Sequence, residues 1–336
     1  MLREVEFPGR CGRSRSRTAG AAGLLAGAPR IVAAGAIALL TAVALTGCGL
    51  GAGPAPTAVQ LLVTRDFGAH MVRRTDAPKV KGQETAMSLL MRNDAVTTRY
   101  GGGFVESIDG VSGGREAGQP FDWFYYVNGV EAEQGAAATT VYPGDHIWWD
   151  LHDWSQTEDV PAVVGSFPEP FLNGMDGERL PVRIECLSVG GYACRTVTAR
   201  LRALGVPAAI AAIGSSGEPE TLRVIVAPWA AVRGDLALRT LELGPAASGV
   251  YALFSAEGRT LTLLDENGRR VRGLGAGAGL VAATRQGKDA PVWLVTGTDA
   301  TGVDLAARGF DTNTLGSRFA VAFTSTGALP VPELSR

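Results

Sequence analysis

Hydrophobic and polar positions divide the chain into one long apolar run and many short periodic segments. The run, residues 31–47, has no charged residue and consists mostly of Ala, Leu, Val and Ile. Further along, residues 59–66 and 104–108 have the length and composition of strands. Residues 84–94 carry apolar side chains at the spacing of a helix. Beyond the apolar run, the pattern predicts a globular protein built from short elements.

An aromatic segment makes the next part of the chain the easiest to interpret. Residues 122–127 form a β-rich run that is followed by Asn128-Gly129, a strong signal for a hairpin. A Tyr-Pro-Gly-Asp turn at 142–145 precedes a final strand at 146–152. The order β-α-β-β-β predicts a β-grasp-like domain over residues 59–154, in which the sheet wraps on one helix.

The final strand combines aromatic and ionisable side chains. With a period of two, Ile147, Trp149 and Leu151 share the face that suits a core against the helix. The other face carries His146, Trp148, Asp150, His152 and Trp154. That face suits either stacking on a flat ligand or packing against the rest of the chain, and both readings stay open. The candidate ligand contacts are Tyr125, Tyr126, Asn128, His146, Trp148, Asp150, His152 and Trp154.

A metal site on the same strand is disfavoured by its spacing. His146, Asp150 and His152 face one way, but successive same-face residues of a strand stand about 7 Å apart. One ion cannot be reached from both ends of that series without a bulge, so we predict no metal ligands.

The second half of the chain contains an internal similarity with an offset of 68 to 70 residues. The matching pairs of segments are 200–205 with 270–275, 224–227 with 292–295, 234–237 with 302–306, and 250–258 with 319–327. After a Pro-rich connector at 155–176, the pattern predicts a duplicated α/β domain at 177–330. Its strand-strand-helix-strand repeats cover about 195–258 and 266–327. Two pseudo-symmetric lobes and a single α+β domain that grew by duplication are both compatible with this pattern. Fold class is therefore α+β, with the β-grasp-like domain first and the duplicated domain second.

The apolar run has the features of an export signal. Six arginines precede it, and it ends in Leu45-Thr46-Gly47-Cys48. This ending resembles the lipobox of bacterial lipoproteins. The resemblance implies a signal peptide at 1–47, lipidation of Cys48, a linker at 48–58 and a chain anchored on the extracytoplasmic face of the cell membrane. The alternative is an uncleaved membrane helix, for which seventeen apolar residues are the short limit.

Export would place the cysteines of the mature chain in an oxidising compartment. Cys11 lies in the segment expected to be removed, and Cys48 is the expected lipid acceptor. Cys186 and Cys194 remain, and we predict a disulfide between them. The competing metal site would need further Cys or His residues nearby, and all three histidines lie elsewhere in the sequence.

Charge and composition exclude several functions. The first 47 residues hold six arginines and two glutamates, which leaves 25 basic and 31 acidic residues in the rest. This balance argues against nucleic-acid binding. Residues 155–336 contain no histidine, so no Ser-His or Cys-His pair can form within that half. The Gly-rich segments 273–279 and 296–302 match no nucleotide-binding motif. We predict a protein that is not an enzyme and has no catalytic residues.

Three motifs carry a resemblance to a known family. They are Gly103-Phe104, the Trp-Phe-Tyr-Tyr-Val-Asn-Gly segment at 123–129, and Gly-Asp-His-Ile-Trp at 144–148. Residues 84–154 resemble a DUF4430-type domain that is similar to the C-terminal domain of transcobalamin and intrinsic factor. The resemblance implies a ligand-binding β-grasp fold, and in those carriers the domain covers one face of cobalamin. The large helical domain of the carriers has no counterpart here.

Together these observations predict a lipoprotein that binds a small molecule, cobalamin or a related cofactor, beside a vitamin or cofactor transporter. The alternative is a cell-surface protein-interaction or adhesion module, in which the same aromatic residues contact protein or glycan.

Overall fold

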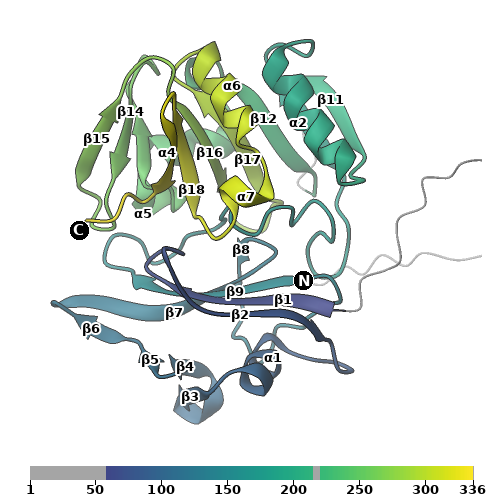
Figure 1. Cartoon of the computed structure of the whole chain (residues 1–336), viewed down its shortest axis with the longest axis vertical. Coiled ribbons are helices and arrows are strands. Elements are labelled where there is room, and N and C mark those ends of the chain that lie inside the picture. The colour runs from purple at the N-terminus through teal and green to yellow at the C-terminus, as the bar shows by residue number, and fades with distance from the viewer. Residues whose placement is uncertain (1–57, 215–219, 336) are drawn as a thin grey trace, which may run out of the picture. The chain divides into compact units, whose positions relative to one another are not determined.

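The computed structural model describes residues 58–214 and 220–335, and this part of the chain is mixed α+β with most of its residues in strands (Figure 1). The predicted α+β class is thus confirmed. The apolar run, Cys48 and nearly all of the predicted linker lie outside the described residues. None of the helices in the described ranges is long and apolar enough to cross a membrane.

The first half forms a sheet with strand order β2-β1-β9-β7-β6. The strands are β1 (Ala58–Arg65), β2 (His70–Lys79), β6 (Gly114–Glu116), β7 (Gln119–Val127) and β9 (His146–Asp153), and β8 (Val130–Glu131) pairs with β7. The central pair, β1 and β9, is parallel, and the flanking pairs are antiparallel. Helix α1 (Ala86–Asn93) begins at a capping box in which Thr85 and Ser88 each accept a backbone N–H of the other.

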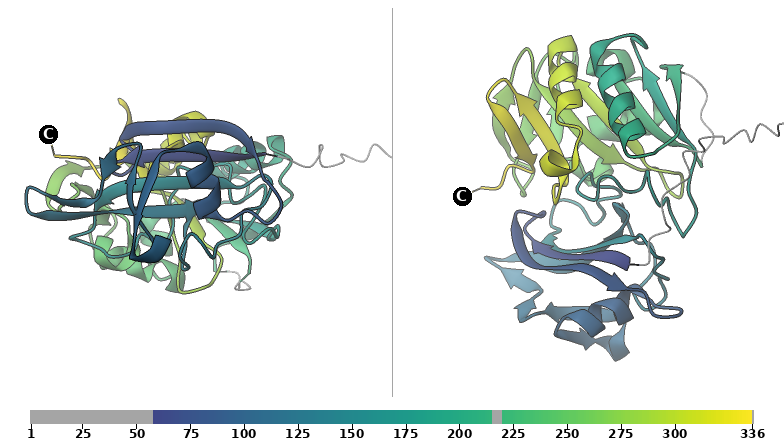
Figure 2. Two further views of the ribbon diagram at one scale, coloured as in Figure 1. Left: turned by 90° about the horizontal axis from the view of Figure 1, so that it is seen from below. Right: turned by 45° about the vertical axis from the view of Figure 1, so that its right-hand side comes forward.

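One face of this sheet is covered by α1 and by a small sheet of β3 (Val96–Arg99), β4 (Phe104–Ile108) and β5 (Val111–Ser112), with the 3-10 turn η1 (Tyr100–Gly102) between β3 and β4 (Figure 2). Leu89 and Leu90 of α1 pack there against Ile147, Trp149 and Leu151 of β9. The core face predicted for the final strand is confirmed by this cluster.

The second half is built on a seven-stranded sheet of order β11-β10-β12-β17-β16-β18-β19. Its strands are β10 (Val182–Cys186), β11 (Ala208–Ala212), β12 (Leu222–Pro228), β16 (Gly279–Thr284), β17 (Val292–Gly297), β18 (Ala320–Thr324) and β19 (Gly327–Val331). The four strands from β11 to β17 are parallel, and the remaining pairs are antiparallel.

Helices cover the faces of this sheet and a second small sheet adjoins it. On one face α2 (Tyr192–Ala203) and α6 (Ala300–Arg308) contact each other and share a core with β10, β12 and β17. The short elements are α3 (Trp229–Val232), η2 (Leu236–Leu238), α4 (Arg239–Glu242), α5 (Pro245–Ser248) and α7 (Thr312–Leu315). The second small sheet has the order β13 (Ala252–Phe254), β14 (Leu261–Leu264), β15 (Arg270–Leu274).

An aromatic seam joins the two halves, which belong to a single compact unit, Gly51–Arg336. It consists of Phe67, Tyr126, Trp148, Tyr251 and Phe319, all in one buried cluster. The Phe319 ring lies 5.1 Å from that of Phe67 and 5.4 Å from that of Trp148. Val160 and Val163, from the segment predicted as a connector, are buried in the same cluster. The predicted domain limits stay predictions, because side chains of all three segments share this core.

The predicted pair of pseudo-symmetric lobes is not confirmed. The strands matched across the two copies, β12 and β17, are adjacent and parallel in one sheet, with Val226 opposite Val295. Other matched segments differ in structure: 200–205 includes the end of α2 whereas 270–275 includes β15. What the copies share is a strand that runs directly into a helix, β12 into α3 and β17 into α6.

Replacement of Gly68 tests how closely the halves approach. A Cβ atom on Gly68 would lie 2.2 Å from the Ser317 carbonyl oxygen and 2.9 Å from the Trp148 ring. Gly82 is the matched control, since it also has positive φ but nothing within 4 Å of the added atom. Gly82→Ala should cost about 1–2 kcal/mol from its left-handed backbone. Gly68→Ala should cost about 1–3 kcal/mol beyond that, because packed atoms must move. Urea unfolding of both variants measures the difference, and equal losses would contradict the close approach.

Candidate functional site

The residues predicted to contact a ligand are mostly buried. Tyr126, Asn128, Trp148 and Asp150 have no exposed surface, His152 is 1% exposed, and His146 and Tyr125 are below 9%. Only Trp154 retains intermediate exposure. The face of β9 that carries these aromatic residues is therefore covered. Of the two interpretations of this face, packing against the rest of the chain matches the structure.

Rings from both halves cover this face. His152 lies between Phe67 and Phe124, with ring centroids 4.7 and 4.5 Å away. Trp148 is flanked by Phe319 and by Gly165, where a Cβ atom would lie 2.6 Å from the indole. No space for a stacked ligand remains on these rings.

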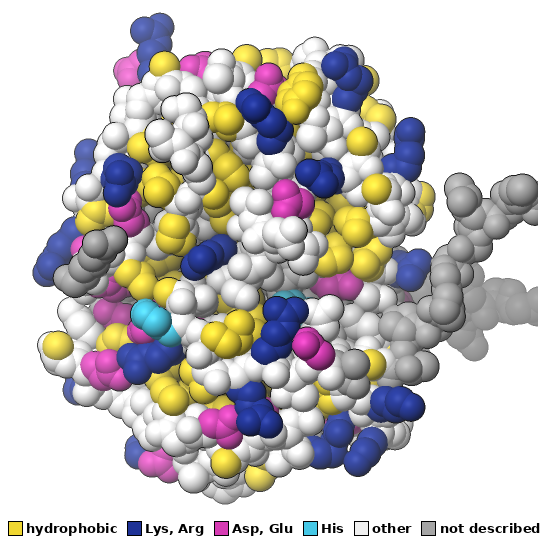
Figure 3. All heavy atoms as spheres, in the orientation of Figure 1, with side chains coloured by type: hydrophobic (Ala, Val, Ile, Leu, Met, Phe, Trp, Pro, Cys, Tyr) yellow, Lys and Arg dark blue, Asp and Glu magenta, His cyan; other side chains and the backbone are white. Residues whose placement is uncertain are grey.

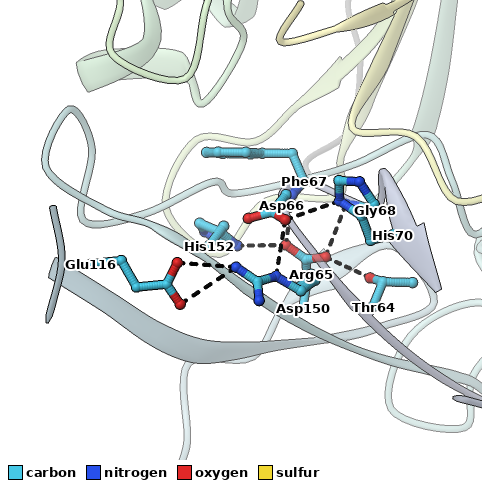
Figure 4. A network of polar contacts seen from close by, with 9 residues as sticks. All are labelled: Thr64, Arg65, Asp66, Phe67, Gly68, His70, Glu116, Asp150 and His152. Atoms are coloured by element: carbon cyan, nitrogen blue, oxygen red, sulfur yellow. Dashed lines mark hydrogen bonds and ion pairs between the residues drawn. The ribbon is translucent and has the colours of Figure 1, made fainter. Parts of the chain in front are cut away.

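Asp150 organises the polar groups at the centre of the seam (Figure 4). Its carboxylate accepts hydrogen bonds from the backbone N–H groups of Phe67 (3.0 Å) and Gly68 (2.9 Å). It also accepts one from the Thr64 hydroxyl at 2.5 Å and contacts His152 Nδ1 at 2.9 Å. Thr64 in turn accepts the indole N–H of Trp148 at 2.7 Å. The His-Asp pair lies inside the core, so its geometry serves to hold the β1–β2 turn.

The edge of this network reaches the surface through an ion-pair chain, also visible in Figure 4. Asp66 Oδ2 lies 2.9 Å from both Arg65 Nε and His70 Nδ1, and Arg65 pairs with Glu116 at 3.1 Å. The groups are partly exposed, so the chain of charges contributes little stability compared with the buried part.

Asn128 holds the hairpin through its backbone conformation and its amide group. Its backbone is left-handed (φ 54°), as the Asn-Gly signal predicts. Its amide donates to Asp145 at 2.8 Å and to the Gly174 carbonyl at 2.9 Å, and its oxygen accepts from the His146 backbone. Asn128 thus joins the hairpin, the start of β9 and the segment near residue 174.

Tyr125 and Trp154 have similar structural partners. The Tyr125 hydroxyl contacts Thr139 at 2.7 Å and donates to the Gln134 carbonyl, and its ring stacks on Trp149. The Trp154 indole donates to Asp122 at 3.0 Å.

Burial lowers the pKa of His146 to about 4, so this residue is neutral near pH 7.

A cleft of about 510 Å³ opens beside these residues, at the end of the sheet where β8 and residues 132–145 lie. Its walls carry charges of both signs. The acidic residues are Glu131, Glu133, Asp145 and Asp176, the basic ones are Arg285 and Lys288, and Tyr142 and Thr139 add hydroxyl groups. Tyr125, which was predicted to contact a ligand, does not line the cleft but contacts Thr139, which does.

The carboxyl groups of the cleft differ in their electrostatics. Burial raises the pKa of Glu131 to about 7, helped by the negative charge of Asp159, while the Val160 N–H that Glu131 accepts at 2.6 Å opposes this. Burial also raises the pKa of Asp145, against hydrogen bonds from the Tyr142 backbone and Asn128. Glu133 is exposed and pairs with Arg285 at 3.0 Å. Near neutral pH the cleft can therefore accept hydrogen bonds and can also donate one from Glu131.

Sequence analysis missed the charged residues of this cleft. Glu131 follows the hairpin by two positions, but no motif marks it. Arg285 is 152 residues from Glu133 in sequence, so no spacing rule connects them.

Within the described ranges, no group of three His, Cys, Asp or Glu side chains could hold a metal ion. The predicted disulfide between Cys186 and Cys194 is confirmed.

The buried carboxyl groups predict an unusual pH dependence of stability. Burial raises the pKa of Glu131 and of Glu169 to about 7, above the usual value near 4.5. The folded state then binds more protons than the unfolded state, so unfolding free energy should rise as pH falls from about 8 to about 6.5. Below about 6.5 the lowered pKa of His146 acts in the opposite direction, because the unfolded chain protonates first.

Urea unfolding at several pH values tests this dependence. Glu131→Gln should reduce the gain on acidification, whereas Glu257→Gln, at an exposed position, should leave it unchanged. Stability that falls steadily from pH 8 to pH 6.5 in the unmodified chain would show that these carboxyl groups do not titrate as their burial implies.

Comparisons with known proteins bear on one part of the sequence interpretation, the DUF4430-type resemblance of residues 84–154. No curated protein matches the chain. The family model described as "Domain of unknown function (DUF4430)" matches residues 83–153, which run from just before α1 to the end of β9 and include both acidic residues 131 and 145 of the cleft. A DUF4430 domain is therefore present at residues 83–153.

Proposed function

We propose that the protein is a lipid-anchored extracytoplasmic binding protein whose small-molecule ligand occupies the cleft beside β8. The observation that carries the proposal is that one surface of the DUF4430 segment is covered and another is open. Its aromatic face is filled by the second half of the chain, whereas its hairpin end is open and lined by charged and hydroxyl groups.

The chemistry of the cleft favours a ligand rich in hydrogen-bond donors. Glu131, Asp145 and Asp176 supply carboxyl oxygens on the side of the DUF4430 segment and its continuation. Arg285, at the opposite end of the sequence, is held by Glu133 and by the Asp289 carbonyl. Cobalamin and related corrinoids carry a rim of amide groups that can donate to carboxylates. The volume of the cleft suits one edge of such a molecule.

The extracytoplasmic location is supported by two independent features. The lipobox-like ending at Cys48 suggests export and lipidation. The disulfide between Cys186 and Cys194 suits an oxidising compartment. A β-grasp-like architecture for residues 59–154 is part of the same proposal, supported by the parallel central pair β1–β9 with α1 on one face.

Titration with cyanocobalamin, followed by calorimetry and by its visible spectrum, tests the ligand. The double variant Glu131→Ala/Asp176→Ala should weaken binding at least about tenfold, the effect of losing about 1.4 kcal/mol of contacts. Asp76→Ala, on the exposed edge strand β2, is the matched control. If neither this corrinoid nor others bind, or if the double variant binds as tightly as the parent, the proposed ligand is wrong.

Anchoring has a separate test. Cys48→Ser should abolish lipidation and release the protein from the membrane fraction, because a serine has no thiol to carry the lipid. Membrane fractionation and the mass of the mature N-terminus measure this. Normal processing and retention of the variant would contradict the lipobox interpretation.

A further inference from the structure

Exposed hydrophobic side chains gather on one short stretch of the second half. Among the described residues, five of the thirteen exposed large hydrophobic side chains fall between positions 187 and 210. They are Leu187, Val189, Tyr192, Leu204 and Ile210. Three of them, at about half exposure (53%, 49% and 46%), lie within six positions of one another on the loop between β10 and α2 and at the first residue of that helix.

This loop is held in place by its surroundings. The disulfide between Cys186 and Cys194 closes it, and the Leu187 backbone donates to Val226 of β12. Inside the loop, Gly191 donates to the Ser188 carbonyl in a tight turn. The exposed side chains of Leu187, Val189 and Tyr192 are thus presented on a fixed support, and their ordering cost on binding is small.

The charged side chains on the segment that contains the loop are all basic. Residues 186–214 contain three arginines and neither Asp nor Glu, in a chain whose acidic residues outnumber its basic ones. Arg195, Arg200 and Arg202 are all exposed on α2. Arg200 lies 3.8 Å from Asp311, and Arg195 donates to the Gly190 carbonyl of the loop itself. On the face seen in Figure 3, dark-blue basic side chains lie among yellow hydrophobic ones in the region of α2 and β11.

We propose that the loop at 187–192 and the arginines of α2 form a contact surface for a membrane with anionic lipids. Leu187 and Val189 enter the boundary between headgroups and acyl chains, Tyr192 takes the interfacial position that its hydroxyl favours, and the arginines meet lipid phosphates. Charge complementarity favours a lipid surface over a second copy of the chain. A two-fold contact here would oppose two sets of arginines.

The inference rests on the proposed function in one respect, which is that the anchor keeps the chain beside a bilayer. Under that condition a weak contact suffices, because the tether raises the local concentration of lipid. The contact then sets the orientation of the anchored protein.

Co-sedimentation with vesicles tests the surface without the anchor. The protein begins at position 48 with Cys48→Ser and keeps the whole compact unit Gly51–Arg336. It should bind vesicles of phosphatidylcholine mixed with phosphatidylglycerol more tightly than phosphatidylcholine alone. Leu187→Ser/Val189→Ser/Tyr192→Ser should weaken this binding at least about tenfold. The matched control, Leu236→Ser/Leu243→Ser/Val271→Ser, removes three exposed hydrophobic side chains elsewhere, two of them more exposed than those at 187–192, and should bind as the parent does.

The charge component has its own pair of variants. Arg195→Gln/Arg202→Gln should lower the affinity for the anionic vesicles about fivefold per arginine and reduce its dependence on salt. Arg259→Gln/Arg269→Gln, at exposed positions of the second half, should leave both unchanged. Hydrogen exchange of the unsubstituted chain provides a measurement that needs no variant, and vesicles should protect residues 187–192.

Several results would overturn the inference. They are failure of the parent to bind anionic vesicles, equal binding by the two triple variants, and absence of protection at 187–192. A concentration-dependent dimer in lipid-free sedimentation that is lost in the Leu187 triple variant would assign the patch to a second copy instead. None of these results depends on processing at Cys48 or on ligand in the cleft, so failure here is distinguishable from failure of the proposed function.

Discussion

The hydrogen bonds that the buried Asp150 carboxylate accepts fix the geometry on which the rest of the molecule depends. Asp66, Phe67 and Gly68 all have left-handed backbone, which is costly for a bulky residue such as phenylalanine. The carboxylate offsets that cost by accepting the N–H groups of Phe67 and Gly68. Phe67 can then project from the first sheet into a pocket formed by Tyr251 and Phe319 of the second half. A polar interaction therefore determines where an apolar contact forms, and that contact joins the two halves.

Only the side chains of the DUF4430 segment that lie outside the aromatic seam remain accessible to a ligand. Tyr126, Trp148 and His152 are buried in the seam, so these three rings are not exposed for stacking on a ligand. The hairpin end keeps carboxyl groups whose burial is incomplete, and the second half contributes the cations opposite them. The cleft is thus a property of the whole chain, since Glu133 of the first half pairs with Arg285 of the second. The loop at 187–192 belongs to another part of the second half, which separates the proposed membrane contact from the proposed ligand site in sequence and in element.

Local patterns in the sequence predicted much of the secondary structure. The aromatic run predicted at 122–127 lies within β7 (Gln119–Val127), and the Asn-Gly turn follows it. The final strand predicted at 146–152 is one residue shorter than β9, and β4 matches its prediction residue for residue. Strand β2 could not be predicted, because His70–Lys79 has few apolar positions and forms a strand only as the outer partner of β1. The alternation identified two faces of β9 but could not tell which surface would meet the polar-aromatic face. Burial of that face depends on Phe319, which is 171 positions from Trp148. The internal similarity corresponds to a strand followed by a helix in both copies, while the surrounding strand pairings differ, so the predicted duplication of the domain stays a prediction.

The position of Phe319 near the C-terminus has a consequence for biogenesis. Synthesis proceeds from the N-terminus, so the whole first sheet exists before the ring that seals it. Until Phe319 has been made, Trp148 and Tyr126 lack the neighbouring ring that excludes water from them, and the nascent chain carries an incompletely covered hydrophobic face. Such a chain is prone to wrong associations while it waits. A truncation that removes Phe319 together with β18 and β19 would therefore leave the distant first half as the part most in need of a chaperone.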